Sequence, residues 1–284
     1  MVIFMNALEI RDLCKQHGSF LLDNLNLTLP SGCIMGLIGE NGAGKSTTIK
    51  LILNMIKKDS GSISIFGKDN DEGFNLSKED IGVVLDEVGI SQCLTVKQVG
   101  KIMKHTFRNW SDEAYSSYIE RFKLPADKKF KEFSRGMKMK LGIAVALSHD
   151  AKLLILDEAT SGLDPVIRDE ITDIFGEFTR DENHAVLISS HIVSDLEKIC
   201  DYIAFLHNGK LLLCEEKDRL KEQYVIVHCT ENEFKQFPHS SVIGKKESAY
   251  GTEAIVKRDF VQDGMQYGPI DIEQLFIFMT KEVH

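Results

Sequence analysis

The strongest constraint on the fold is a glycine-rich stretch at residues 39–47, GENGAGKST. It follows an apolar run at residues 34–38 and precedes apolar residues at helical spacing from residue 49 to residue 56. The order therefore predicts a strand, a loop and a helix. The stretch satisfies G-x-x-x-x-G-K-[ST], in which glycines leave backbone N–H groups free to surround phosphates and the helix adds its positive end. The expected ligand is a nucleoside triphosphate; the alternative is a glycine-rich turn with a solvated lysine.

The residues of this loop have distinct expected roles. Lys45 reaches the β- and γ-phosphates, and the Ser46 hydroxyl is placed to bind Mg²⁺. The loop residues expected to bind the nucleoside triphosphate are Gly39, Asn41, Gly42, Ala43, Gly44, Lys45, Ser46 and Thr47.

Hydrolysis also needs a metal ligand and a group that activates water, and two further stretches offer them. The run LLILDE at residues 153–158 ends in two carboxylates. The carboxyl ends of parallel strands meet the ligand crevice, so we expect Asp157 to hold Mg²⁺ through water and Glu158 to orient the attacking water. His191, after AVLISSH, is placed to hydrogen-bond the γ-phosphate. Taken alone, the acids could be a solvated helix cap and the histidine could be structural.

The apolar runs predict an α/β core. Those at residues 34–38, 81–85, 153–156 and 186–189 are short and continuous, which is typical of strands buried on both faces of a mostly parallel sheet. Asp164 and Pro165 predict the start of a helix. HNGK at residues 207–210 predicts a type I′ hairpin.

Two regions differ from this core. From about residue 90 to residue 150 the pattern is helical, with Ser111 and Ser134 as candidate caps, and this predicts an inserted helical subdomain. After about residue 216, YVIVHC and TEAIVKR alternate like strands and an amphipathic helix follows at residues 272–279. We predict a core domain at 1–215 and a small α+β appendage at 216–284, which could serve dimerisation, regulation or simple cover of sheet edges.

Composition excludes several classes of protein. The net charge of -9 argues against nucleic-acid binding and against direct attraction to anionic lipid. No apolar run approaches the roughly 20 residues that span a bilayer, so a membrane link would need a protein partner. No secretory leader opens the sequence, and the 6 cysteines show no close pairing. These features predict a reduced, cytosolic protein.

The ordered set GENGAGKST, FSRGMKMKL, LLILDEATSGLDP and ISSH resembles the nucleotide-binding subunit of an ABC transporter. The resemblance implies a P-loop NTPase cassette that hydrolyses ATP with Mg²⁺ and drives separate transmembrane permease subunits. It further implies that Ser134 and Gly136 grip the γ-phosphate bound to a second cassette, either the same chain or a paralogue. Residues 162–164 would cross that dimer interface. The tail and the IGVVLDE variant are most similar to the branch that drives antibiotic, bacteriocin or lipid exporters, attached to the inner face of the cell membrane through the permease.

Two positions depart from the family pattern, and one contact has two candidate residues. Asp86 stands where a glutamine usually contacts Mg²⁺, water and the permease. Its carboxylate can still accept bonds from water or metal, so we include it with Ser46 and Asp157 as a candidate metal ligand and expect it to retain a coupling role, with a contact to the permease alone as the alternative. Arg135 replaces a glycine and either adds charge there or is simply solvated, and we favour a solvated side chain. The aromatic residue that stacks on adenine is either His17 or Phe20.

Two other functions fit parts of the sequence. A soluble ABC ATPase acting on ribosomes or DNA would be expected to carry two cassettes or a long coiled coil, and the sequence has neither. An ATP sensor without turnover is disfavoured by the presence of Glu158 and His191, although Asp86 and Arg135 leave it open.

Overall fold

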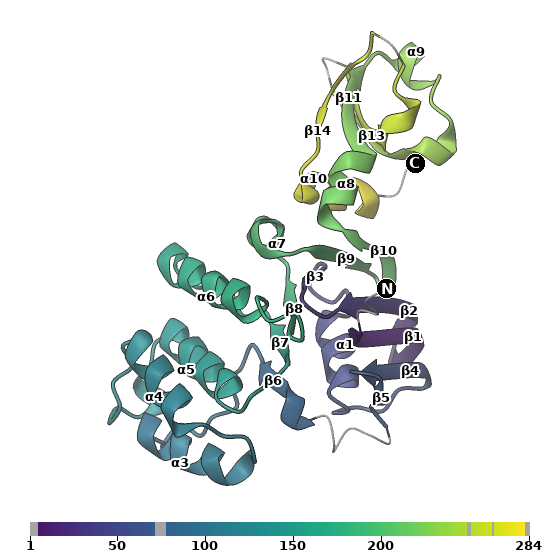
Figure 1. Ribbon diagram of the computed structural model, residues 1–284. Coiled ribbons are helices and arrows are strands. Elements are labelled where there is room, and N and C mark those ends of the chain that lie inside the picture. Colours follow the sequence, from purple (N-terminus) through teal and green to yellow (C-terminus); the bar gives the residue numbers. More distant parts are fainter. Residues whose placement is uncertain (1–4, 72–77, 249–250, 263, 282–284) are drawn as a thin grey trace.

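The computed structural model describes residues 5–71, 78–248, 251–262 and 264–281 (Figure 1). The described residues form three sheets with helices around them. No helix within those ranges has the length and apolar character needed to cross a membrane.

The central sheet has six strands in the order β10-β9-β3-β8-β7-β6. Five are parallel and β10 is antiparallel to β9. The strands are β3 (Ile34–Ile38), β6 (Ile81–Val84), β7 (Leu153–Asp157), β8 (Ala185–Ser190), β9 (Tyr202–His207) and β10 (Lys210–Glu216). Every residue of β3, β7 and β8 is buried, as continuous apolar runs predict. The four predicted strands are confirmed with shifts of one residue at their ends.

The register of these strands creates the site edge. Ile38 lies beside Ser190, and Asp157 lies beside Ser189. The carboxyl ends of β3, β7 and β8 therefore meet at one edge, where the chain leaves them toward residues 39–44, 158 and 191.

A second sheet lies at the N-terminal side and is antiparallel, in the order β2-β1-β4-β5. Its strands are β1 (Asn6–His17), β2 (Phe20–Pro30), β4 (Ser60–Ile65) and β5 (Lys68–Asp69). Helix α1 (Lys45–Ile52) shares one apolar core with this sheet and the central sheet, including Leu8, Ile49 and Leu187. The sequence analysis did not identify this sheet.

The helical region contains α3 (Val96–Thr106), α4 (Asp112–Arg121) and α5 (Arg135–Leu147) and lies beside the edge strand β6 (Figure 1). The predicted caps are confirmed: Ser111 accepts from Ala114 N–H at 3.1 Å and Ser134 accepts from Met137 N–H at 3.3 Å. Helix α6 (Pro165–Phe178) likewise begins after Asp164, whose carboxylate accepts from Ile167 N–H at 3.0 Å. The short η1 (Lys78–Asp80) and η2 (Phe130–Glu132) lie in the connections.

The predicted hairpin is also present between β9 and β10. Asn208 and Gly209 have φ of 47° and 77°, as the positive-φ pair of a type I′ turn requires.

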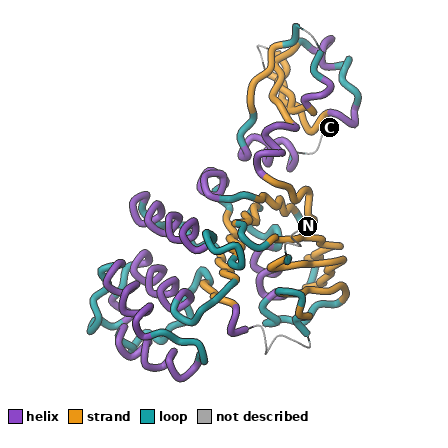
Figure 2. Tube along the Cα trace, viewed as in Figure 1, coloured by secondary structure: helices purple, strands orange, loops and turns teal. Residues whose placement is uncertain are grey.

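The C-terminal residues form a four-stranded antiparallel sheet, β12-β13-β11-β14, with short helices (Figure 2). Its strands are β11 (Tyr224–Cys229), β12 (Val242–Ser248), β13 (Gly251–Lys257) and β14 (Gln266–Pro269). The helices are α8 (Lys217–Gln223), α9 (Glu231–Phe234), η3 (His239–Ser241), η4 (Arg258–Phe260) and α10 (Ile272–Thr280). The strands and the final helix predicted here are confirmed.

Helix α7 (Val193–Ile199) joins this C-terminal unit to the central sheet. Glu197 of α7 binds Lys221 Nζ at 2.6 Å and accepts from the Ile272 N–H at 3.3 Å. The rings of Phe205 and Phe276 lie 5.1 Å apart in one apolar core that both parts share. The C-terminal unit is therefore packed against the part that holds the central sheet through its own hydrophobic residues.

Candidate functional site

The loop between β3 and α1 has the backbone geometry that its glycines predict. Gly42 and Gly44 have φ of 85° and 114°, in the left-handed region that favours glycine. A Cβ at Gly39 would lie 2.4 Å from the Leu206 carbonyl oxygen, so only glycine fits there. Gly44 precedes α1 without a side-chain cap, which leaves N–H groups of the first helical turn available to an anion.

The other loop residues differ in exposure. Asn41, Gly42 and Ser46 are exposed and Thr47 is half-buried, whereas Ala43 is buried. The loop is therefore anchored at Ala43, whose carbonyl accepts from Gly209 N–H at 3.0 Å, and open to solvent on the other side.

Lys45 lies in the centre of the site, with only 5 % of its side chain exposed. Its Nζ donates to the Gly39 carbonyl at 2.7 Å and to the Glu40 carbonyl at 3.2 Å. It also forms an ion pair with Glu158 Oε1 at 3.2 Å. Three oxygen partners thus compensate the buried ammonium, as a buried charge requires.

Glu158 connects Lys45 to His191. Its Oε2 lies 2.8 Å from His191 Nδ1, and its backbone has a φ of 53°. A glutamate with a left-handed backbone conformation is uncommon, and residues in such conformations are often found at functional sites. The structure thus brings together Lys45, Glu158 and His191 from three separate segments.

Asp157 is held by a serine that the sequence analysis missed. Ser189 Oγ donates to Asp157 Oδ1 at 2.6 Å and accepts from the Glu158 N–H at 3.1 Å. Ser189 is completely buried. Its hydroxyl therefore orients the Asp157 carboxylate and holds the backbone of Glu158. Ser189 lies directly opposite Asp157 in the parallel register, which the sequence alone does not give.

The donor set fits a magnesium ion that is also held by phosphates. Ser46 offers an exposed hydroxyl and Asp157 a carboxylate, and Mg²⁺ is usually bound by one or two such oxygen ligands plus substrate phosphates. No cluster of three or more His, Cys, Asp or Glu that could hold a metal occurs among the described residues.

Ser134 and Gly136 lie at the first turn of α5, away from the phosphate loop. Within the described ranges, neither makes a hydrogen bond or ion pair with residues 39–47. A Cβ at Gly136 would lie 2.8 Å from Ile167 Cδ1, which shows how closely this turn packs against α6.

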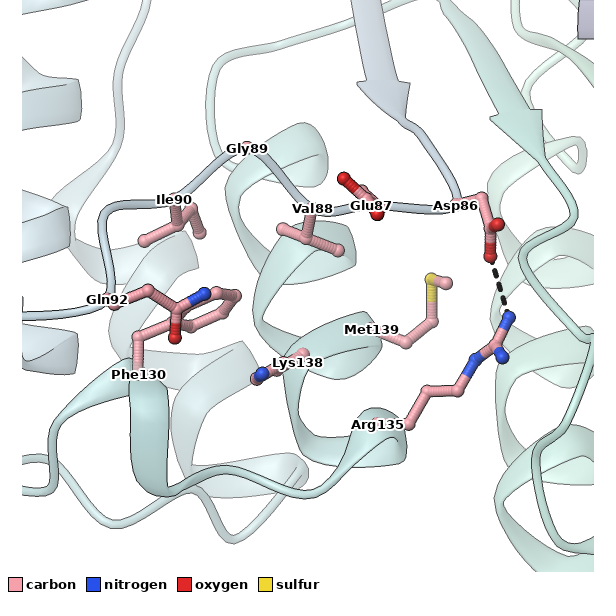
Figure 3. A pocket seen from close by; sticks show the side chains of 10 residues that line it. All are labelled: Asp86, Glu87, Val88, Gly89, Ile90, Gln92, Phe130, Arg135, Lys138 and Met139. Atoms are coloured by element: carbon pink, nitrogen blue, oxygen red, sulfur yellow. Dashed lines mark hydrogen bonds and ion pairs between the residues drawn. The ribbon is translucent and has the colours of Figure 1, made fainter.

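Arg135 is not simply solvated, so that expectation is wrong. Its Nη2 donates to Asp86 Oδ1 at 2.7 Å (Figure 3). Asp86 lies two residues beyond β6, at the same edge of the central sheet as Asp157. An unpaired carboxylate there attracts the nearest available guanidinium.

His17 and Phe20, the two candidates for the adenine contact, flank the turn between β1 and β2. His17 is exposed, whereas Phe20 is half-buried in the core beneath α1. A Cβ at Gly44 would lie 2.9 Å from Phe20 Cζ. Phe20 therefore packs against the phosphate loop, whereas His17 is exposed to solvent.

Comparison with known proteins gives consistent matches. The sequence model described as "ABC transporter" matches residues 22–161. The lantibiotic transport ATP-binding protein SrtF of Streptococcus pyogenes is 39% identical over 217 residues, covering 74% of this chain and 91% of that protein. The bacitracin transport ATP-binding protein BcrA of Bacillus licheniformis is 38% identical over 225 residues, covering 76% of this chain and 72% of that protein.

Solved structures agree in fold. An ATP-binding subunit of an ABC transporter has a TM-score of 0.69 and 26% identity, covering 76% of this chain and 92% of that one. A dimeric ATP-binding cassette bound to ADP and phosphate has a TM-score of 0.66 and 21% identity, covering 74% of this chain and 98% of that one. The second likeness shows the fold alone.

Proposed function

The chain belongs to the family of ABC transporter ATP-binding subunits, and on that premise we propose that it drives a separate membrane permease exporting a peptide antibiotic or a related compound. It binds and hydrolyses ATP, as members of this family do. The export assignment is supported by the relatives named for lantibiotic and bacitracin transport. The contact set from Lys45 through Glu158 to His191 carries the assignment of the chemistry to residues.

Each residue of that set has a role that its contacts support. Lys45 would exchange its Glu158 partner for β- and γ-phosphate oxygens when ATP enters. Glu158, released from Lys45, would orient water and accept its proton, and His191 would hold the freed carboxylate through Oε2. Catalysis of phosphoryl transfer is mostly positioning and electrostatic stabilisation.

Ser46 and Asp157 would hold Mg²⁺, with Asp157 acting through water. When bound, the ion neutralises charge on the phosphate oxygens. Ser189 fixes the Asp157 carboxylate in one orientation at 2.6 Å, and such support by residues behind a ligand strengthens a metal site.

We assign adenine stacking to His17, because Phe20 is already packed against the phosphate loop. The loop residues 39–47 would surround the phosphates, with the N–H groups at the start of α1 pointing to them.

A complete site would need a second cassette, either another copy or a paralogue. Ser134 caps α5 away from the phosphate loop of its own chain, and Gly136 lies beside it. We therefore place Ser134 and Gly136 against the γ-phosphate of the partner cassette, where the N-terminus of α5 would stabilise negative charge.

The permease contact is assigned to a cavity of about 660 Å³ beside α5, which Asp86, Glu87, Val88 and Gln92 line from one side (Figure 3). The chain would thus work on the cytoplasmic side of the membrane through its partner. We expect the Asp86→Ala variant to change ATP turnover or its stimulation by the permease; if neither changes, the coupling role of Asp86 is refuted.

Purification of the chain with its native partners tests the whole proposal. We expect co-purification of a membrane permease, and phosphate release from MgATP that rises when the permease is present. A chain that hydrolyses ATP but is recovered with ribosomes or DNA would overturn the transport assignment, and a chain that binds ATP without releasing phosphate would support an ATP sensor.

A further inference from the structure

Arg135 connects three segments that are far apart in the sequence. Its Nη2 binds Asp86 Oδ1 at 2.7 Å, which ties the first turn of α5 to the segment after β6 (Figure 3). Its guanidinium also lies over Gly162, because a Cβ built at that glycine would be 3.1 Å from Arg135 Nη1 and 3.4 Å from Cζ. One side chain therefore contacts both the segment at residue 86 and the turn before α6.

The turn at Gly162 is shaped to receive this side chain. Gly162 has a φ of 68°, which favours glycine, and the missing side chain leaves space for the planar guanidinium. Gly136 and Ile167 also pack closely, since a Cβ added at Gly136 would lie 2.8 Å from Ile167 Cδ1. The start of α5 and the turn before α6 are thus packed so that movement of one displaces the other.

Charge explains why the arginine matters for Asp86. Asp86 is followed by Glu87, and both are exposed at the edge of the sheet where the triphosphate would bind. Among the described residues, Arg135 is the ion-pair partner of Asp86. The pair keeps this carboxylate from adding net negative charge near the phosphates, and it also fixes its direction.

We propose that Arg135 is a positioning residue that holds Asp86 beside the nucleotide of its own chain while setting the turn at Gly162 and the cap at Ser134. The inference rests on the proposed cassette dimer, in which Ser134 and residues 162–164 face the partner's nucleotide. Arg135 then links the two ATP sites mechanically. The pair is half exposed, at 50% and 54% of the two side chains, so its strength is modest and falls with added salt.

A double-mutant cycle in the full-length protein tests this. MgATP hydrolysis is measured for the wild type, D86N, R135Q and the double variant, each at low and high salt. We expect R135Q to lower kcat of the otherwise wild-type protein about two- to fivefold. This factor corresponds to the free energy that an exposed ion pair typically contributes. In the D86N background, R135Q should lower kcat by a clearly smaller factor, because only the contact of Arg135 with the turn at Gly162 is then lost. The loss should appear in kcat rather than KM, because within the described part of the chain the side chains of Asp86 and Arg135 form their ion pair with each other and not with the phosphate loop.

The matched control is Lys140→Gln on the same helix. It breaks the ion pair between Lys140 and Glu170, 2.6 Å apart, which also joins α5 to α6 but does not reach Asp86. Its effect should add to that of D86N, whereas R135K should restore part of the kcat lost in R135Q, because lysine keeps the charge that pairs with Asp86 but not the planar guanidinium over Gly162. Equal losses from R135Q in both backgrounds, or failure of R135K to restore kcat, would overturn the inference while leaving the ATPase intact. A wild type without turnover would overturn the proposed chemistry instead.

Discussion

Replacement of Glu158 by glutamine probes the assigned chemistry most directly. The Glu158 carboxylate touches Lys45 Nζ at 3.2 Å and His191 Nδ1 at 2.8 Å. Glutamine keeps the shape and one acceptor oxygen but removes the charge and the basicity. If Glu158 acts as the general base, hydrolysis should slow by about 10²- to 10⁴-fold, which corresponds to roughly 3–5 kcal/mol in activation free energy.

ATP binding should respond in the opposite sense. In the wild type the triphosphate must displace the Glu158 carboxylate from Lys45, and in Glu158→Gln that competition is weaker. Because a buried ion pair gains little net free energy after desolvation, the affinity for ATP should stay equal or rise by no more than about tenfold. The ATP-bound dimer should therefore accumulate in the variant.

The same substitution should cost some stability. Breaking a buried ion pair can cost about 3–5 kcal/mol when the remaining charge has no other partner. Lys45 keeps the Gly39 and Glu40 carbonyls as acceptors, so the free energy of unfolding should fall by only about 1–2 kcal/mol.

The assay is phosphate release at saturating MgATP, with equilibrium ATP binding and sedimentation measured on the same preparation. Glu177→Gln is the control, because that carboxylate is paired with Arg121 away from the site and its loss should leave turnover unchanged. Near-normal turnover in Glu158→Gln would show that another group activates water. Absence of any MgATP-induced dimer in that variant would refute the two-cassette site.

Four further outcomes follow from the structure. Lys45→Ala should weaken ATP binding, measured by calorimetry, by at least about tenfold, because loss of a hydrogen bond to a charged group has an effect of that size. Chelation of Mg²⁺ with EDTA should abolish phosphate release, and restored turnover on adding Mg²⁺ back would distinguish metal loss from unfolding. Ser189→Ala should lower kcat about 10- to 100-fold, because it frees the Asp157 carboxylate; unchanged kinetics would deny Ser189 a positioning role. Burial lowers the pKa of His149 below its usual 6.5. As the pH drops, His149 is therefore protonated in the unfolded chain before it is protonated in the folded one. Its contribution to the stability of the fold is full above about pH 6.5 and is lost as the pH falls through the folded pKa. The melting temperature should therefore fall more steeply from pH 7 to pH 5.5 in the wild type than in His149→Gln.

The parts of the fold that the sequence predicted correctly are those set by local chemistry. The phosphate loop follows from glycines at positive φ beside a lysine, and the helix starts at Ser111, Ser134 and Asp164 follow from side chains that cap N–H groups. The parallel strands were found because burial on both faces leaves continuous apolar runs.

The missed features depend on contacts between distant segments. The N-terminal antiparallel sheet was overlooked although residues 25–29 alternate apolar and polar, as a half-buried strand does. The pairing of Arg135 with Asp86 joins residues 49 positions apart, and nothing in either local sequence indicates it. Ser189 likewise gains its role only from the parallel register that places it beside Asp157.

The apolar core shared by α7 and the C-terminal unit bears on how this protein could have changed length during evolution. Loss of the segment after residue 216 would remove the Phe276 ring that covers Phe205, which is fully buried now. Exposed apolar surface of this kind favours aggregation. A shortened descendant would need a polar replacement at Phe205, so residue 205 in long and short relatives would record whether the extension was gained or lost together with its binding face.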